Sequence, residues 1–365
     1  MRTTPPGLTP GLAAAVALAL VTAACGTTGR AVQDSGVLAV GGEVIAGARL
    51  MAAARDEGEV SVYTSLNDVG NDAMKDAFER DTGIAVEGVQ EPNNRLFERI
   101  EDEKRNGSLS ADVIAMPDES LVHALVSDGV FAEHTVPADD DIPARFKAPD
   151  RRFYTLSSAA TVIAYNSDLV GPGEVPRSWR ELPNAGRGEQ RIGLLRASQG
   201  AGGWGLALFL RKRFGERYLR ELAASEPSLT DSADTLAGQL GRGEVGIAAI
   251  RLPEVGRLQQ QGAPVEYLWP ADGAPMFNFY IGAVAKAGHS DAARVYLNWA
   301  LSEHGQSVLA EEGIDYPVNT EASRPELYGD ALPSIDEVDP YFAHHRDWID
   351  LREEWTADWD RAFDG

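Results

Sequence analysis

The strongest candidate for ligand chemistry is a glycine-rich segment at residues 198–205, which reads Ser-Gln-Gly-Ala-Gly-Gly-Trp-Gly. Glycines allow backbone N–H groups to approach a ligand closely, and the amino end of a following helix attracts negative charge. The alternative is a flexible turn that needs glycine only for its conformation. The candidate ligand contacts in this segment are Ser198, Gln199, Gly200, Ala201 and Gly202.

A second candidate is Arg251, which follows a strand-like segment at residues 243–250. An arginine at a strand end can hold a carboxylate or phosphate through two parallel hydrogen bonds. The alternative is an ordinary ion pair between Arg251 and Glu254. Ser65 and Asp118 also follow predicted strands, and open α/β sheets bind ligands beyond the carboxyl ends of their strands.

The sequence contains none of the common catalytic or metal-binding motifs. Its six histidines form no HExxH arrangement, and there is no GxSxG motif or P-loop. Ser65 and Ser198 could be nucleophiles of a secreted hydrolase, but no histidine lies near either in sequence. The adjacent His344 and His345 could bind a surface metal, although two solvated histidines are the favoured interpretation. We therefore expect no catalysis, no cofactor and no metal.

These residues lie within an alternation of predicted strands and helices. Strand-forming segments at residues 59–65, 84–89 and 111–116 are separated by amphipathic segments, a pattern typical of parallel β-α-β units. The extended run at residues 153–165 is much longer than an ordinary strand of about 5–6 residues. This length predicts a strand that leaves one sheet and enters another, and it marks a candidate hinge.

Several passages together resemble the family 1 extracellular solute-binding proteins of ABC importers, near the ferric-iron, phosphonate and thiamine branch. They lie at residues 57–65, 77–86, 111–114, 163–166, 178–182, 198–203 and 301–306. The resemblance implies an α/β, two-lobed, type II periplasmic-binding-protein-like fold with hinge strands between the lobes. Each lobe would be a mixed, mostly parallel sheet flanked by helices. The resemblance also implies a solute held between the lobes, a membrane permease as partner, and no enzyme activity.

The iron-binding branch would place its ligands near Asn67, Pro117 and the pair Pro253-Glu254, and none of these positions carries the expected ligand. Iron held by other ligands stays open as an alternative. The remaining hydroxyls, amides, glycines and Arg251 suit a solute that carries an oxyanion. We expect one site between the lobes, formed by Ser65, Asn67, Asp118, Ser157, Ser158, residues 198–202, Arg251 and Tyr280.

The first residues have the features of an export signal. Arg2 precedes a stretch from Gly11 to Ala24 that has no charged residue and is too short to span a bilayer, which needs ~20 apolar residues. Cys25, the single cysteine, follows small residues and resembles the lipidated first residue of a bacterial lipoprotein. Residues 1–24 are thus a predicted signal peptide, and residues 25–48 a lipidated tether on the extracytoplasmic face of the cell membrane.

The same patterns predict the domain limits. Residues 49–158 and 269–312 are assigned to lobe 1, residues 159–268 to lobe 2, and residues 313–365 to a helical segment packed mainly on lobe 2. The net charge of −23 argues against nucleic-acid binding, because no local basic patch is visible. We expect a monomer that contacts the membrane only through its lipid. A purely structural surface lipoprotein is a further alternative.

Overall fold

The computed structural model describes residues 36–66, 68–185, 191–327 and 330–363. The helices are α1 (Ala48–Glu57), α2 (Asp68–Thr82), α3 (Asn93–Arg105), α4 (Glu119–Ser127), α5 (Gly200–Ala223), α6 (Ala233–Gly241), α7 (Leu252–Gln260), α8 (Ser290–Ala300), α9 (Glu303–Gly313), α10 (His345–Asp350) and α11 (Arg352–Phe363). The strands are β1 (Leu38–Val40), β2 (Glu43–Ala46), β3 (Glu59–Thr64), β4 (Ala85–Gln90), β5 (Val113–Met116), β6 (Tyr154–Asn166), β7 (Ile192–Leu195), β8 (Ser228–Thr230), β9 (Ile247–Arg251), β10 (Val265–Leu268), β11 (Ala274–Ala283), β12 (Tyr316–Pro317), β13 (Glu326–Leu327), β14 (Asp330–Ala331) and β15 (Pro340–Phe342).

Two groups of parallel strands lie at opposite ends of one hydrogen-bonded path. Its order is β4-β3-β5-β11-β6-β9-β7-β8. In the first strand group, β3 pairs in parallel with β4 and β5. In the second strand group, β7 pairs in parallel with β8 and β9. Antiparallel pairs of β11 with β5 and β6, and of β6 with β9, connect the two groups.

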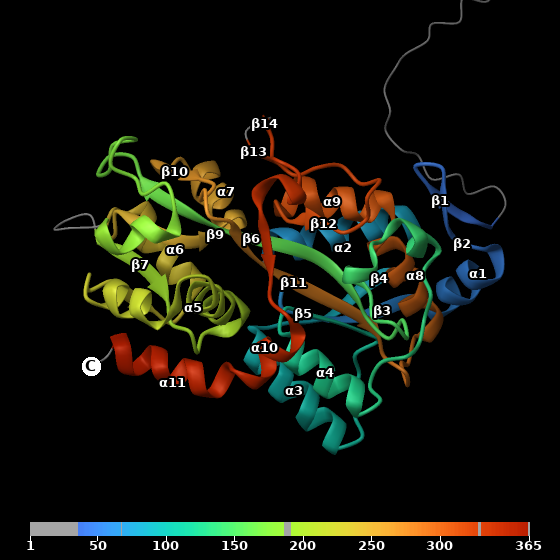
Figure 1. Ribbon diagram of the computed structural model, residues 1–365. Coiled ribbons are helices and arrows are strands. Elements are labelled where there is room, and N and C mark those ends of the chain that lie inside the picture. The colour runs from blue at the N-terminus through green and yellow to red at the C-terminus, as the bar shows by residue number, and fades with distance from the viewer. Residues whose placement is uncertain (1–35, 67, 186–190, 328–329, 364–365) are drawn as a thin grey trace, which may run out of the picture.

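Strand β6 belongs to both halves of the molecule, as its predicted length required. Its first part, from Tyr154 to Ala160, pairs with β11, and its second part, from Thr161 to Tyr165, pairs with β9. Figure 1 shows β6 in the centre, with α5, α6 and α7 on one side and α1, α2, α8 and α9 on the other. The long strand predicted at residues 153–165 is thus confirmed within one residue, while the lobe limits stay a prediction.

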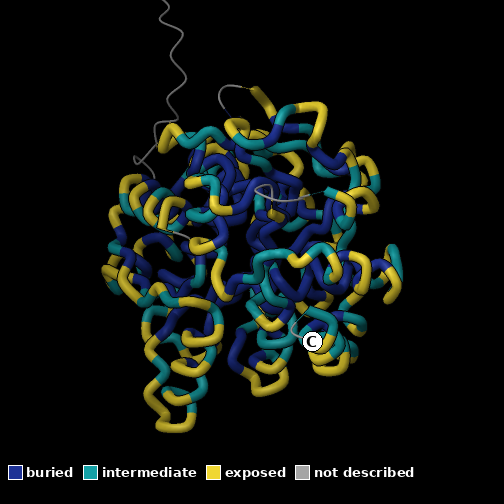
Figure 2. Tube along the Cα trace, turned by 90° about the vertical axis from the view of Figure 1, so that its left-hand side faces the viewer, coloured by how far each residue is buried: buried dark blue, intermediate teal, exposed yellow. Residues whose placement is uncertain are grey.

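Burial explains why β6 and its neighbours hold the centre. All but one of the thirteen β6 side chains are buried, a pattern typical of a strand covered on both faces. Figure 2 shows the buried segments running through the interior, with exposed residues on the outer helices and loops. No helix among the described residues is both long and apolar enough to cross a membrane.

Part of the predicted tether is ordered, which corrects the limit at residue 48. Strands β1 and β2 form an antiparallel hairpin, and Leu38, Val40 and Ile45 are buried in the main core. The side-chain amide of Asn298 donates a hydrogen bond to the backbone oxygen of Ile45, 2.8 Å away, which ties the hairpin to α8. The folded body therefore begins before residue 40. Cys25 and residues 1–35 lie outside the described residues.

The C-terminal segment contacts helices on both sides of β6. Helix α11 packs against α5, and α10 packs against α4. Figure 1 shows these last two helices, in red, beneath α5 and beside α3 and α4. Trp348 is buried, and its backbone oxygen accepts a hydrogen bond from the indole nitrogen of Trp204. Residues 313–365 were expected to pack mainly on lobe 2, and the contact of α10 with α4 adds an attachment to the other side.

Candidate functional site

A cavity of about 900 Å³ lies where the two strand groups face each other. This volume is typical of a small-molecule site. The six strands of the two groups reach it with their carboxyl ends: Ser65 follows β3, Gln90 ends β4, Pro117 follows β5, Leu195 ends β7, Asp231 follows β8 and Arg251 ends β9. The location agrees with the general rule for ligand sites in open α/β sheets.

Half of the predicted site residues line this central cavity. They are Ser65, Gln199, Gly200, Ala201, Gly202 and Arg251. The backbone N–H of Ser65 donates a hydrogen bond to the oxygen of Ala115, so β5 fixes Ser65 at its strand end. The glycine-rich segment forms the first turn of α5, as the order of strand, loop and helix predicted.

The structure places five of the other predicted residues outside the described lining of this cavity, so it does not bring them together with the first six. Asp118 is fully buried and caps α4, and its carboxylate pairs with Arg352. The buried Tyr280 lines a separate cavity of about 20 Å³, which is the size of one water site. Ser198 is exposed just outside the lining. Asn67 lies outside the described residues.

Ser157 and Ser158 on β6 also lie outside the central cavity, because each is engaged by a neighbouring segment. The hydroxyl of Ser157 donates to the carboxylate of Asp315 at 3.3 Å, and that of Ser158 donates to the amide oxygen of Asn278 at 2.6 Å. Successive side chains of a strand point to opposite faces. The two serines therefore could not both face one cavity.

Arg251 reaches the cavity but is already paired. Its guanidinium forms an ion pair with the buried carboxylate of Glu254 and lies 5.5 Å from the ring centroid of Phe277. Burial lowers the pKa of Arg251, and the nearby Asp315 opposes that shift. The same burial raises the pKa of Asp315 to about 6. Two carboxyl groups therefore already offset much of the charge of Arg251. This makes Arg251 less suited to the expected role of holding an anionic solute.

Two helix amino ends supply the positive character instead. The first turns of α3 and α5 line the cavity from opposite strand groups, through Asn93, Asn94 and Arg95 and through residues 200–202. Neither turn carries an acidic residue. The first N–H groups of a helix lack partners inside the helix, and they favour an anion. Arg95 is exposed at the same end of the cavity, and its charge helps to lower the pKa of the neighbouring Glu91.

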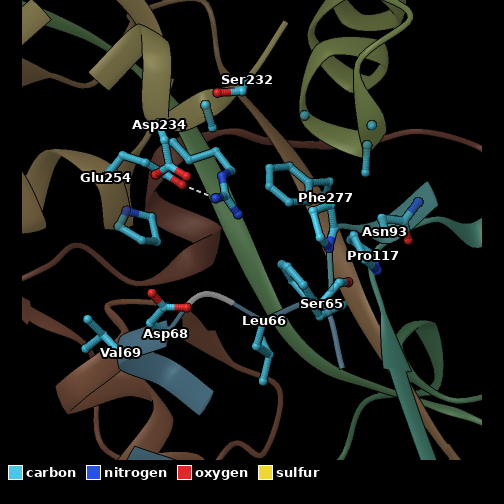
Figure 3. Close-up of a pocket in the computed structure, with 18 of the residues that line it drawn as sticks. Ser65, Leu66, Asp68, Val69, Asn93, Pro117, Ser232, Asp234, Glu254 and Phe277 are labelled. Atoms are coloured by element: carbon cyan, nitrogen blue, oxygen red, sulfur yellow. Dashed lines mark hydrogen bonds and ion pairs between the residues drawn. The ribbon is translucent and has the colours of Figure 1, made fainter. Parts of the chain in front are cut away.

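The opposite part of the cavity is acidic. Figure 3 shows Asp234 and Glu254 on one wall and Asp68 on the facing wall, away from Asn93 and Pro117. Helices α2, α6 and α7 begin here, and each has an acidic residue in its first turn. Asp234 pairs with Arg257 at 3.1 Å, whereas Asp68 accepts a hydrogen bond from the amide of Gln90 and forms no ion pair among the described residues. One end of the cavity therefore favours an anion, and the other end favours a cation or a hydrogen-bond donor.

Three buried polar atoms of the lining lack a hydrogen-bond partner among the described residues. They are the hydroxyl oxygen of Ser65, the amide oxygen of Asn93 and one carboxylate oxygen, Oε2, of Glu254. A buried polar atom without a partner costs about 1–3 kcal/mol, so such atoms need a specific explanation. All three can accept a hydrogen bond, and a solute with N–H or O–H donors would satisfy them.

The described lining residues include no histidine and no tyrosine. No imidazole base therefore lies beside Ser65 among the described lining residues. The resemblance to the iron-binding branch implies a pair of tyrosine ligands near Pro253-Glu254, and the described lining offers no phenolate there. The carboxylates that line the cavity lie on several different elements. Among the described residues, none of them belongs to a group of three metal-ligating side chains that converge.

Sequence reasoning missed the residues that follow β4 and β8. Asn93 and Arg95 come after the predicted strand at residues 84–89, where the strand-end rule applies as it did for Ser65. Ser232 and Asp234 follow β8, a strand of three residues with too little pattern to predict. The sequence pattern was thus sufficient to predict Asn93 and Arg95, but not Ser232 and Asp234.

Comparison with known proteins assigns the family. Residues 109–337 match the family model described as bacterial extracellular solute-binding protein, and the chain belongs to this family. It is 24% identical over 314 residues to iron uptake protein A1 of Synechocystis, covering 79% of this chain and 85% of that protein. It is also 24% identical over 318 residues to a Salmonella paratyphi A protein named "Putative 2-aminoethylphosphonate-binding periplasmic protein", covering 83% and 90%.

Solved structures confirm the fold class expected from the sequence. Iron-bound HitA from Pseudomonas aeruginosa superposes with a TM-score of 0.70 at 18% identity, covering 83% of this chain and 99% of HitA. AfuA from Actinobacillus pleuropneumoniae, with fructose-6-phosphate bound, has a TM-score of 0.72 at 20% identity, covering 84% and 99%. The protein is thus an extracytoplasmic solute-binding protein of the ABC-importer type. Its family consists of binding proteins and not of enzymes.

Proposed function

We propose that this protein is the lipid-anchored receptor of an ABC importer and captures a small solute that combines an oxyanion with a hydrogen-bond donor. The observation that carries the proposal is the polarity of the central cavity. The α3 and α5 amino ends offer N–H donors at one end, and the unpartnered Oε2 of Glu254 offers an acceptor near the acidic end. A solute with opposite groups at its two ends would match both.

Two similar proteins carry names or ligands with this combination. The name of the Salmonella relative includes 2-aminoethylphosphonate, which has an ammonium and a phosphonate. The AfuA structure holds fructose-6-phosphate, which has hydroxyls and a phosphate. Both solutes pair an oxyanion with hydrogen-bond donors, which supports the proposed solute class. After capture, the solute would be delivered to a membrane permease, and Cys25 would supply the lipid anchor.

Calorimetry with three matched compounds tests the solute class. We expect 2-aminoethylphosphonate to bind more tightly than ethylphosphonate, which lacks the ammonium, and more tightly than ethylamine, which lacks the phosphonate. Loss of either group should lower the affinity at least about tenfold, because the polar groups at one end of the cavity then have no partner. A hexose phosphate tests hydroxyls in place of the ammonium. Equal affinity for all of these compounds would contradict the proposal.

Two variants assign the ends of the cavity. Asn93→Asp places a carboxylate at the start of α3, and we expect it to weaken phosphonate binding at least about tenfold without loss of stability, since helix amino ends tolerate acids. Asn106→Asp makes the same change at the other end of α3, outside the cavity, and should leave affinity unchanged. Glu254→Gln should weaken the ammonium-bearing solute but not ethylphosphonate.

Ferric iron held by carboxylates is the second candidate, favoured by the six acidic side chains of the lining. Carboxylate oxygens are suitable ligands for a hard cation. Ferric citrate is therefore included in the same titrations. Saturable binding of iron that is lost in both Asp68→Asn and Glu254→Gln, together with no response to any phosphonate or phosphate, would replace the proposed solute class with iron.

A further inference from the structure

A cluster of metal-ligating side chains lies outside the central cavity, where the C-terminal segment meets α4. Glu119 and His123 are one turn apart on α4, and His345 is the first residue of α10. The Oε1 atom of Glu119 is 3.1 Å from Nδ1 of His345 and 3.8 Å from Nε2 of His123. Among the described residues, this is the one group of three such side chains whose ligating atoms converge.

The composition and spacing of this cluster suit zinc. Two imidazoles and one carboxylate form a common zinc ligand set with a fourth position open to water. Zinc–ligand bonds of about 2.0–2.2 Å in a tetrahedron place the ligand atoms roughly 3.3–3.6 Å apart. The three ligating atoms here all lie within 4.8 Å of one another, so small side-chain rotations would suffice. The side chains are 19–39% exposed, which gives an ion access from solvent.

The surrounding contacts hold the cluster in place without a metal. The His123 ring packs edge-on against Phe153, with centroids 5.3 Å apart, and lies 3.9 Å from the His345 ring. The buried carboxylate of Asp118, next to Glu119, pairs with Arg352 and accepts a hydrogen bond from Trp348 at 3.4 Å. These bonds fix α10 against the start of α4, and such preorganisation favours binding.

We propose that Glu119, His123 and His345 bind one zinc ion, with water in the open position, and that this ion clamps the C-terminal helices to α4. Helix α11 continues from α10 onto α5, which lies on the other side of β6. The clamp therefore joins the C-terminal segment to the first strand group, while α11 joins it to the second. This ion would link elements of the fold and lie outside the central cavity that captures the solute.

Metal titration of the full chain without an affinity tag tests the proposal. After treatment with chelator, we expect one equivalent of Zn²⁺ to bind in calorimetry, and Co²⁺ to give the visible absorption of a four-coordinate site. His345→Ala and Glu119→Gln should each lower the affinity for zinc at least about thirtyfold. The matched control is His344→Asn, which changes the neighbouring histidine outside the cluster and keeps a side chain able to cap α10.

Several results would overturn the zinc site. They are zinc affinity that survives His345→Ala, equal loss in His344→Asn, or no saturable binding by the unaltered protein. The melting temperatures of His345→Gln and of the unaltered protein are compared in the presence of chelator. Equal values show that a loss of zinc affinity does not come from unfolding. A zinc-induced rise in the melting temperature should also disappear in this variant. Phosphonate titrations are read separately, so failure of the zinc site leaves the proposed solute intact.

Discussion

Replacing Asp315 by Asn should stabilise the protein at neutral pH. Asp315 is 3% exposed, one of its carboxylate oxygens has no partner, and burial raises its pKa from 3.8 to about 6. Because the folded pKa is raised, folding favours the protonated carboxyl. The favourable contribution is complete below pH ~4 and is lost as the pH rises through 6. At 1.36 kcal/mol per pKa unit, holding this group ionised in the folded state at pH 7.5 costs about 3 kcal/mol.

Urea unfolding at pH 4.5, 6 and 7.5 measures this cost. We expect the free energy of unfolding of Asp315→Asn to exceed that of the unaltered protein by up to about 3 kcal/mol at pH 7.5, and this difference to shrink to about 1 kcal/mol at pH 4.5. The exposed Asp76→Asn is the control and should stay within about 0.5 kcal/mol at every pH. An Asp315→Asn protein that is less stable at pH 7.5, or equally shifted at all three pH values, would refute this reasoning. In that case, pairing with Arg251 would outweigh burial.

Two further changes test the glycine-rich segment and the anchor. A Cβ at Gly203 would lie 2.1 Å from the backbone oxygen of Arg196, so Gly203→Ala should displace the start of α5 and lower both the melting temperature and solute affinity. Gly202→Ala is the stability control, because its Cβ would meet only a leucine methyl at 3.7 Å, and an equal fall in melting temperature would contradict the steric explanation. Cys25→Ala should move the protein from the membrane fraction to the soluble fraction, and retention in the membrane fraction would show that no lipid is attached there.

The sequence predicted elements whose pattern is local. The strands predicted at residues 59–65, 84–89 and 111–116 are observed as β3 at 59–64, β4 at 85–90 and β5 at 113–116. Gly215, whose φ of 80° interrupts α5, is a local feature of the same kind. Alternation, helical periodicity and a glycine with positive φ depend only on neighbouring residues, so a single sequence carries them.

The site was harder to predict because side-chain direction depends on distant partners. Asp118 follows a strand as Ser65 does, yet its carboxylate turns toward Arg352, which lies more than two hundred residues later in the chain. No local sequence pattern predicts the pairing of Asp118 with Arg352. Ser157 and Ser158 are different, since the two-residue period of a strand already requires them to face opposite sides. That error was avoidable, and the error on Asp118 was not.

The charge of the cavity follows from helix placement more than from any single arginine. A protein with a net charge of −23 repels anions, so an oxyanion site needs local positive potential. Arg251 supplies little of it, because Glu254 and Asp315 already offset its charge. The amino ends of α3 and α5 remain, one from each strand group. An anion between them would interact with both helices at once, which would favour approach of the two strand groups. If Arg251 were instead the main clamp, Asn93→Asp would change affinity little, and Arg251→Gln would abolish phosphonate binding.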